Sequence, residues 1–162
     1  ITISGHIMRK QDHSNAFQVN KNVLVIFSAP SAFVSANWYT TKNMGSTWNY
    51  QTVHARGLLE LKDETHLRNL LTDLTLYFEK DLDAPTQVKN LSKEYMEQNM
   101  KAIYSFDIVV NDLQHVFKLS QNRDEASHTN IQKELNKGDA ACKYMAAAMK
   151  AQSGPKDFHK DL

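Results

Sequence analysis

The chain has 162 residues, a formal net charge of +1, and 41% hydrophobic and 23% charged residues. These values are those of one globular domain, and the near-zero charge gives no electrostatic reason to expect nucleic acid as the main partner. Cys142 is the only cysteine, which excludes an intrachain disulfide and a cysteine-based zinc site and fits a cytoplasmic protein. No apolar run approaches the roughly 20 residues that a membrane-spanning helix needs.

The N-terminal third has the patterns of β-strands. Residues 1–6 alternate apolar and polar side chains, the two-residue period of a half-buried strand. The run NVLVIFSAP at 22–30 is continuously apolar and rich in β-branched residues, which predicts a strand buried on both faces. Residues 31–39 follow almost at once, so we expect a second strand and a hairpin across 29–31.

A long strand and two helical segments follow. Residues 47–61 predict a strand, in which Gly57 indicates a bulge or a close backbone approach. From Asp63 the apolar residues take helical spacing as far as Phe78, with Asp63 or Thr65 available as the N-terminal cap. A second helical stretch is predicted over 86–103, with Tyr95 and Met96 on its apolar side.

The C-terminal third returns to strand character at 104–119 and then to two short helices. The last pair has the outline of a helix-turn-helix, but its second helix is rich in Ala and Met and has few side chains that could read base edges. A plain helical hairpin is the better interpretation. The order of strands, helices, strand and helices predicts an α+β fold that is mainly β.

Familiar catalytic motifs are absent from the sequence. It has no phosphate-binding loop, no dinucleotide-binding glycine motif and no nucleophile elbow. Its seven histidines are scattered and none has HxxxH or HExxH spacing, so no metal site is predicted.

Three clusters are candidates for ligand binding. Arg9 and Lys10 end a strand just before a predicted helix, a position that suits a phosphate, although a solvated basic turn would look the same. The aromatic pairs could flank a planar heterocycle or could simply pack at a barrel end or subunit interface. These residues are Trp38, Tyr39, Trp48 and Tyr50, with the amide of Asn49 between the last two. The segment KLSQNR, which begins at Lys118, closes a strand and could cap a turn.

Four blocks in order resemble the PaiB family, FMN-binding negative transcriptional regulators built on a flavin split barrel. The blocks are SGH at 4–6, VLVIFSAPSAFVSANWY at 23–39, TWNYQTVHARG at 47–57 and KLSQNR at 118–123. The resemblance extends from Ile3 to about Gln152. The chain departs from the family pattern in the residues IMRKQDHSN that follow the first block.

The resemblance implies a six-stranded split β-barrel with flanking helices, a homodimer, and FMN at the dimer interface. It implies that a cofactor site is formed by His6, Arg9, Lys10, Trp38, Tyr39, Trp48, Asn49, Tyr50 and Lys118. It further implies a bacterial repressor that acts in regulation and not in catalysis. DNA is expected as a partner only because members of the family are described as transcriptional regulators. The resemblance implies further strands before the first block, and the chain begins inside a strand pattern without an initiating Met, so we expect the N-terminal strands of the barrel to be missing here.

The expected domain division has three parts. Residues 1–126 would form the barrel with inserted helices at 63–102, residues 127–152 the helical hairpin, and residues 153–162 a tail. Two rival functions remain open, a flavin-dependent oxidoreductase and a haem-binding split barrel with a histidine ligand.

Overall fold

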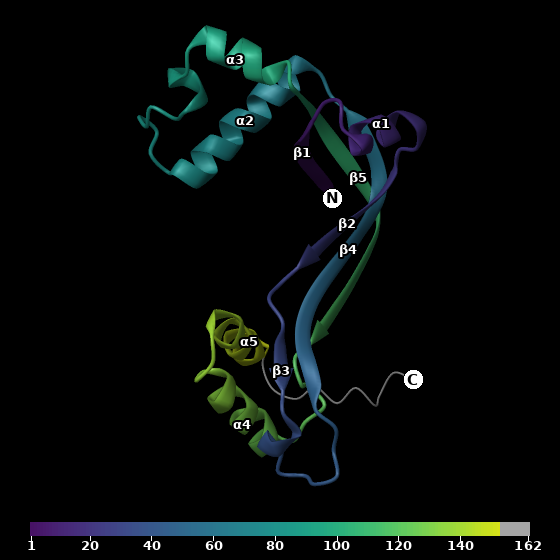
Figure 1. Cartoon of the computed structure of the whole chain (residues 1–162), viewed down its shortest axis with the longest axis vertical. Helices are drawn as coiled ribbons and strands as arrows, with labels where there is room; N and C mark the ends of the chain where they lie inside the picture. The colour runs from purple at the N-terminus through teal and green to yellow at the C-terminus, as the bar shows by residue number, and fades with distance from the viewer. Residues whose placement is uncertain (153–162) are drawn as a thin grey trace. The chain divides into compact units, whose positions relative to one another are not determined.

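The computed structural model describes residues 1–152, and the expected tail at 153–162 lies outside the described residues. The strands are β1 (Thr2–Met8), β2 (Asn22–Ser28), β3 (Ala32–Val34), β4 (Thr47–Leu61) and β5 (Ile103–Lys118) (Figure 1). The α-helices are α1 (Asp12–Val19), α2 (Glu64–Glu79), α3 (Lys93–Met100), α4 (Glu125–Leu135) and α5 (Ala140–Ala151). Two short 3₁₀ helices, η1 (Ala36–Trp38) and η2 (Val88–Asn90), complete the order. None of the helices in residues 1–152 has the length and apolar character needed to cross a membrane.

The strands form one five-stranded sheet in the order β1-β5-β4-β2, and β3 also pairs with β4. β1 runs antiparallel to β5, with Thr2 opposite Val109 and Met8 opposite Ile103. β3 runs antiparallel to β4, with Phe33 opposite Trp48. The fifteen-residue strand β4 coincides with the predicted range 47–61.

The predicted hairpin across 29–31 is wrong. β2 and β3 both take β4 as partner and do not pair with each other. The backbone N–H of Ala29 still donates to the carbonyl of Gln51 on β4, 3.1 Å away, so the chain continues along the same partner strand instead of reversing. The second predicted strand is also shorter than expected, because η1 begins at Ala36 after the Ser35 side chain caps it through the Asn37 N–H.

The predicted burial of β2 on both faces is wrong as well. Leu24, Ile26 and Phe27 are 42%, 54% and 51% exposed. β2 ends the strand order, so β4 is its only strand partner within residues 1–152, and an apolar sequence alone does not supply a covering layer.

The helix predicted from Asp63 is confirmed, and the Asp63 carboxylate caps α2 by accepting from the His66 N–H. Phe78, placed by the sequence pattern on the apolar face, is instead 71% exposed. The single helix predicted over 86–103 is wrong: η2 comes first, and the Ser92 hydroxyl then caps α3 through the Tyr95 N–H. Serine favours such local bonds over continuing a helix, which explains the break.

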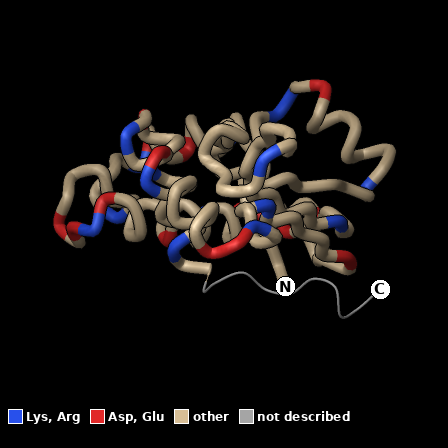
Figure 2. The backbone as a smooth tube through the Cα atoms, turned by 90° about the horizontal axis from the view of Figure 1, so that it is seen from below, with Lys and Arg blue, Asp and Glu red and all other residues tan. Residues whose placement is uncertain are grey.

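Two compact units make up the described chain, and three strands contribute residues to both. Unit 1 consists of residues 1–25 and 55–113, and unit 2 of residues 26–54 with the described residues from 114 onward. In unit 1, Leu67 of α2 packs with Met96 and Met100 of α3. Basic and acidic residues are interspersed along the described backbone (Figure 2). The expected three-part domain division stays a prediction.

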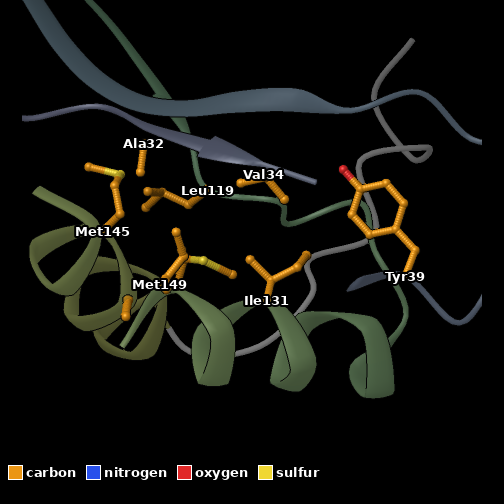
Figure 3. Close-up of a cluster of buried hydrophobic side chains, with 9 residues drawn as sticks. Ala32, Val34, Tyr39, Leu119, Ile131, Met145 and Met149 are labelled. Atoms are coloured by element: carbon orange, nitrogen blue, oxygen red, sulfur yellow. The ribbon is translucent and has the colours of Figure 1, made fainter. Parts of the chain in front are cut away.

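The core of unit 2 lies between β3 and the two C-terminal helices. Figure 3 shows Met145 and Met149 of α5 and Ile131 of α4 close to Ala32 and Val34 of β3. The predicted helical hairpin is therefore confirmed, and it buries its methionine face against a strand. A helix with this apolar stripe needs such a partner surface, since propensity alone rarely stabilises a short helix.

Gly57 marks a close backbone approach, as predicted. A Cβ at this position would lie 2.4 Å from the Val109 carbonyl oxygen and 3.0 Å from its carbonyl carbon. These are backbone atoms of the neighbouring strand, so they cannot rotate away as a side chain could.

We expect Gly57→Ala to lower the free energy of unfolding by about 1–3 kcal/mol, the usual cost of forcing extra volume into a packed site. The matched control is Gly45→Ala, because no atom lies within 4 Å of a Cβ at Gly45. The control should change stability by at most about 0.5 kcal/mol. Urea denaturation of the three proteins measures this, and an equal effect of the two substitutions would contradict the steric explanation.

Candidate functional site

The predicted site residues fall into two groups, one in each unit. His6, Arg9 and Lys10 belong to unit 1, where His6 lies within β1 and the other two directly follow the strand. The six others, Trp38, Tyr39, Trp48, Asn49, Tyr50 and Lys118, belong to unit 2.

Arg9 is held in place by three contacts within unit 1. Its backbone N–H donates to the Ala102 carbonyl at 2.8 Å, and its Nε donates to the Ile103 carbonyl at 2.9 Å. Its guanidinium carbon lies 4.0 Å from the centre of the Tyr104 ring, a cation–π geometry. Arg9 is thus a pre-oriented side chain, although its sequence context is equally typical of a flexible basic turn.

Lys10 and His6 are less constrained. Lys10 is exposed and has a φ of 60°, a left-handed conformation that an L-residue adopts at some cost. His6 is exposed in the middle of β1, where it stands opposite Ser105 of β5.

In unit 2, strand alternation separates Asn49 from its two aromatic neighbours. Trp48 and Tyr50 are 53% and 37% exposed, whereas Asn49 is fully buried. The Asn49 amide is occupied within the chain: its Oδ1 accepts from the Ser120 hydroxyl at 3.0 Å, and its Nδ2 donates to the Met149 sulfur at 3.4 Å. Asn49 therefore ties β4 to the end of β5 and to α5, while Trp48 and Tyr50 leave aromatic surface exposed.

The KLSQNR segment forms a tight turn that positions Ser120 for its hydrogen bond with Asn49. Ser120 has a φ of 61°, and the Gln121 side chain bridges the turn by accepting from the Leu119 N–H at 2.7 Å and donating to the Phe117 carbonyl. The Lys118 ammonium donates to the Thr47 hydroxyl at the start of β4. Within the chain these residues therefore close a turn, which is one of the roles that the sequence left open.

The other aromatic residues of the prediction have different surroundings. Trp48 makes an edge-to-face contact with Phe33, with ring centres 5.9 Å apart. Trp38 packs against the core of unit 2, and Tyr39 is buried in it. The Arg123 guanidinium lies 4.3 Å from the Tyr39 ring centre. Of the four aromatic residues predicted for the site, Trp48 and Tyr50 are therefore the exposed ones, whereas Trp38 is half-buried and Tyr39 is buried.

A polar network that the sequence did not reveal lies at the start of α2 in unit 1. His66 contacts the Ser105 hydroxyl through Nδ1 and the Asp107 carboxylate through Nε2, each at 3.1 Å. The Ser4 hydroxyl donates to Asp107 at 2.6 Å, and the Lys62 ammonium lies 3.4 Å from the same carboxylate. Since a carboxylate only accepts, the His66 Nε2 donates to Asp107.

His66 lies between a serine and an aspartate, as the histidine of a hydrolase triad does, but the side chain of Ser105 is inaccessible because the residue is only 1% exposed. A nucleophile must reach a substrate carbonyl, so the network serves instead to join α2 to β5 and β1. Its components come from three separate segments, β1, residues 62–66 and β5, and only knowledge of the β1–β5 register could have brought them together from the sequence.

The pKa of Asp107 is held below its ordinary value. The hydrogen bond from Ser4 is the largest cause, followed among the stabilising causes by the charges and bonds of His66 and Lys62, and partial burial opposes them. A lowered pKa in the folded state means that the ionised carboxylate stabilises the fold above the ordinary carboxyl pKa of about 3.9. This contribution is lost as the pH falls through the lowered folded value.

We expect Asp107→Asn to reduce the free energy of unfolding by about 1–3 kcal/mol at neutral pH, because charged hydrogen bonds are lost. The difference from the original protein should shrink as the pH is lowered from about 5 through the folded-state pKa. Asp73→Asn, at an exposed position of α2, is the control. Urea unfolding across this pH range is the measurement, and a difference independent of pH would show that the charge of Asp107 contributes nothing.

Comparisons with known proteins give a family match and two structural likenesses. Residues 1–112 match a family described as "Putative FMN-binding domain". The chain is 36% identical over 148 residues to "Protease synthase and sporulation protein PAI 2" of Bacillus subtilis, an alignment that covers 91% of this chain and 71% of the relative. It is 25% identical over 166 residues to "Uncharacterized protein AN0679" of Emericella nidulans, covering 92% of this chain and 66% of that protein.

Two solved structures share the fold at low sequence identity. A "putative 5-nitroimidazole antibiotic resistance protein" from Bacteroides thetaiotaomicron has a TM-score of 0.50 at 15% identity, over 70% of this chain and 60% of that one. The "FAD and Heme binding protein" from Mycobacterium smegmatis has a TM-score of 0.52 at 14% identity, over 72% of this chain and 53% of that one. These likenesses bear on the fold alone, and they confirm the predicted split-barrel class with flanking helices.

Proposed function

The chain belongs to the PaiB family of FMN-binding domains, and on this premise we propose that it binds FMN as a homodimer and acts in regulation. The match of residues 1–112 to the FMN-binding family carries the proposal. The regulatory role comes from the family resemblance and is the finer part of the proposal.

The exposed aromatic residues of β4 support a site for the flavin ring. Trp48 and Tyr50 stand on the same side of the strand, two residues apart, with about half and a third of their surface accessible. Such rings offer flat apolar area to a planar heterocycle. Asn49 would act indirectly, by fixing β4 to the core through Ser120 and Met149.

Arg9 and Lys10 are proposed to attract the FMN phosphate. Arg9 is oriented by Tyr104 and the Ile103 carbonyl, which lowers the entropy lost when a guanidinium binds an anion. His6, Trp38, Tyr39 and Lys118 remain proposed members of the site without a more specific role.

A second copy of the chain is the proposed partner for the exposed strands. β2 exposes Leu24, Ile26 and Phe27, and β5 exposes Val109, Leu113 and Val116, each between 42% and 54% accessible. Apolar strand surface of this kind is a feature of protein interfaces, and symmetric homodimers are the commonest way to cover it.

Direct reading of DNA has little support in the helical hairpin. α5 turns Met145, Ala146 and Met149 into the core. Its exposed residues include the cations Lys143 and Lys150, too few for a strong phosphate-contacting surface. The proposed regulation would therefore act with at most weak, salt-sensitive DNA contact, and a footprint that persists at physiological salt would contradict this part.

The test is FMN titration, followed by flavin fluorescence, of the original protein and Trp48→Ala. Because Trp48 would contact both the ring and the dimer partner, we expect FMN affinity to fall roughly 5- to 30-fold and the dimer to weaken in sedimentation. An absorption spectrum of the purified protein separates bound flavin from haem. Unchanged affinity in Trp48→Ala, or a monomer at micromolar concentration, would contradict the proposal.

Two further variants separate binding from folding. Tyr77→Ala removes an aromatic residue of α2 that is 73% exposed, and it should change neither FMN affinity nor dimerisation. Asn49→Ala should lower the free energy of unfolding by about 1–3 kcal/mol, because the buried Ser120 hydroxyl loses its acceptor.

A further inference from the structure

A cavity of about 420 Å³ lies within unit 1, beside the first turn of α2 and the end of α3. Part of its wall is apolar and comes from Leu61, Leu67, Met100 and Ile103. The remainder carries charged groups from the residue after β1, from the start of α2 and the two residues before it, and from α3 and the residue after it, together with Tyr104 and Ser105. A space of this kind, apolar with a few placed polar groups, is the usual form of a small-molecule site.

Arg9 contributes a fixed guanidinium to this cavity. Its Nε is used by the Ile103 carbonyl and its face by the Tyr104 ring, as described above. Within residues 1–152 its two terminal nitrogens have no hydrogen-bond or ionic partner. A planar fork held in this way is suited to an oxyanion, which it can bind through two parallel hydrogen bonds.

Lys101 supplies a second cation, since it also lines the cavity and its ammonium has no ionic partner among the described residues. The remaining cavity cation, Lys62, is already engaged by Glu60 at 2.9 Å and by Asp107.

The three acids of the cavity wall are each engaged elsewhere. Glu64 pairs with Arg68 and Glu97 with Lys93, both at 3.7 Å, and Asp63 accepts from the His66 N–H at 2.8 Å as the cap of α2. The pairs are exposed and individually weak, but they point the acids to partners outside the cavity lining. Two cations are thus left without a counter-charge, which matches a ligand carrying two negative charges.

We propose that this cavity binds the phosphoryl group of a small phosphate ester, with Arg9 and Lys101 as its ligands and the apolar wall against the organic part. The chemistry fits two sources, the phosphate of FMN itself or a separate phosphate ester. The FMN source rests on the proposed function, in which Arg9 meets the flavin phosphate, whereas a separate ester would occupy Arg9 itself and leave the flavin phosphate to other groups. In both cases the site is argued from the geometry of unit 1.

The first experiment uses the full 162-residue chain freed of flavin and titrates inorganic phosphate, observed by ³¹P NMR. Saturable binding is expected, weakened about tenfold or more in Arg9→Ala and about threefold or more in Lys101→Ala, because each removes a charge-assisted contact. Arg9→Lys keeps the charge but loses the fork and should fall between the original protein and Arg9→Ala. Lys42→Ala removes one exposed cation of unit 2 that has no ionic partner in the described chain, and it should leave binding unchanged.

Circular dichroism and thermal unfolding of each variant verify that it is folded, which is expected because Arg9 and Lys101 are both exposed. Phosphate that does not saturate would overturn the proposal. So would equal affinity in Arg9→Ala, Lys101→Ala and Lys42→Ala.

Competition identifies the source of the phosphoryl group. Displacement of phosphate by FMN but not by riboflavin assigns the cavity to the flavin phosphate, and simultaneous binding of FMN and phosphate assigns it to a separate ester. Both results support the site. FMN binding that persists while inorganic phosphate shows no saturable binding would overturn this inference and leave the proposed flavin function standing.

Discussion

Strand β4 is the element on which the rest of the structure depends, because β2, β3 and β5 all pair with it. Its fifteen residues must therefore meet different neighbours along their length, and the sequence changes character accordingly. Gly57 has no side chain where the Val109 carbonyl of β5 comes closest. Asn49 places an amide where the turn after β5 and the last helix need a polar partner. A glycine and an amide thus stand at the two positions where backbone and polar groups come closest to the strand.

The two-residue period of the same strand separates structural from exposed groups within three positions. Asn49 points to the core and its hydrogen bonds are used there, whereas Trp48 and Tyr50 leave aromatic surface available. A one-residue shift in register would exchange these roles, exposing the amide and burying the indole. The pairing of β3 with β4, which sets Phe33 opposite Trp48, specifies this register. The capacity of this strand for ligand or partner contact therefore follows from its pairing.

In unit 1 the charge presented to the cavity follows from which groups already have partners. Capping of α2 uses Asp63, and the ion pairs on the helices use Glu64 and Glu97. The carboxylate of Asp107 is already paired with Ser4, His66 and Lys62. A cavity with equal numbers of acidic and basic residues in its wall can in this way present positive charge, because partners and not composition decide the local potential.

Local patterns in the sequence determined the elements whose signals are local. The start of α2 at an Asp63 cap, the span of β4, the close approach at Gly57 and the C-terminal hairpin all follow from period, capping and residue size. The tertiary structure alone decided what depends on neighbours far along the chain. Residues 23–27 are all apolar, yet Leu24, Ile26 and Phe27 are exposed, because β2 lies at an edge of the described sheet and its sequence does not supply a covering layer. Arg9 lies over the Tyr104 ring and lines one cavity with Lys101 because β1 and β5 pair in one register, and no short-range pattern encodes that pairing.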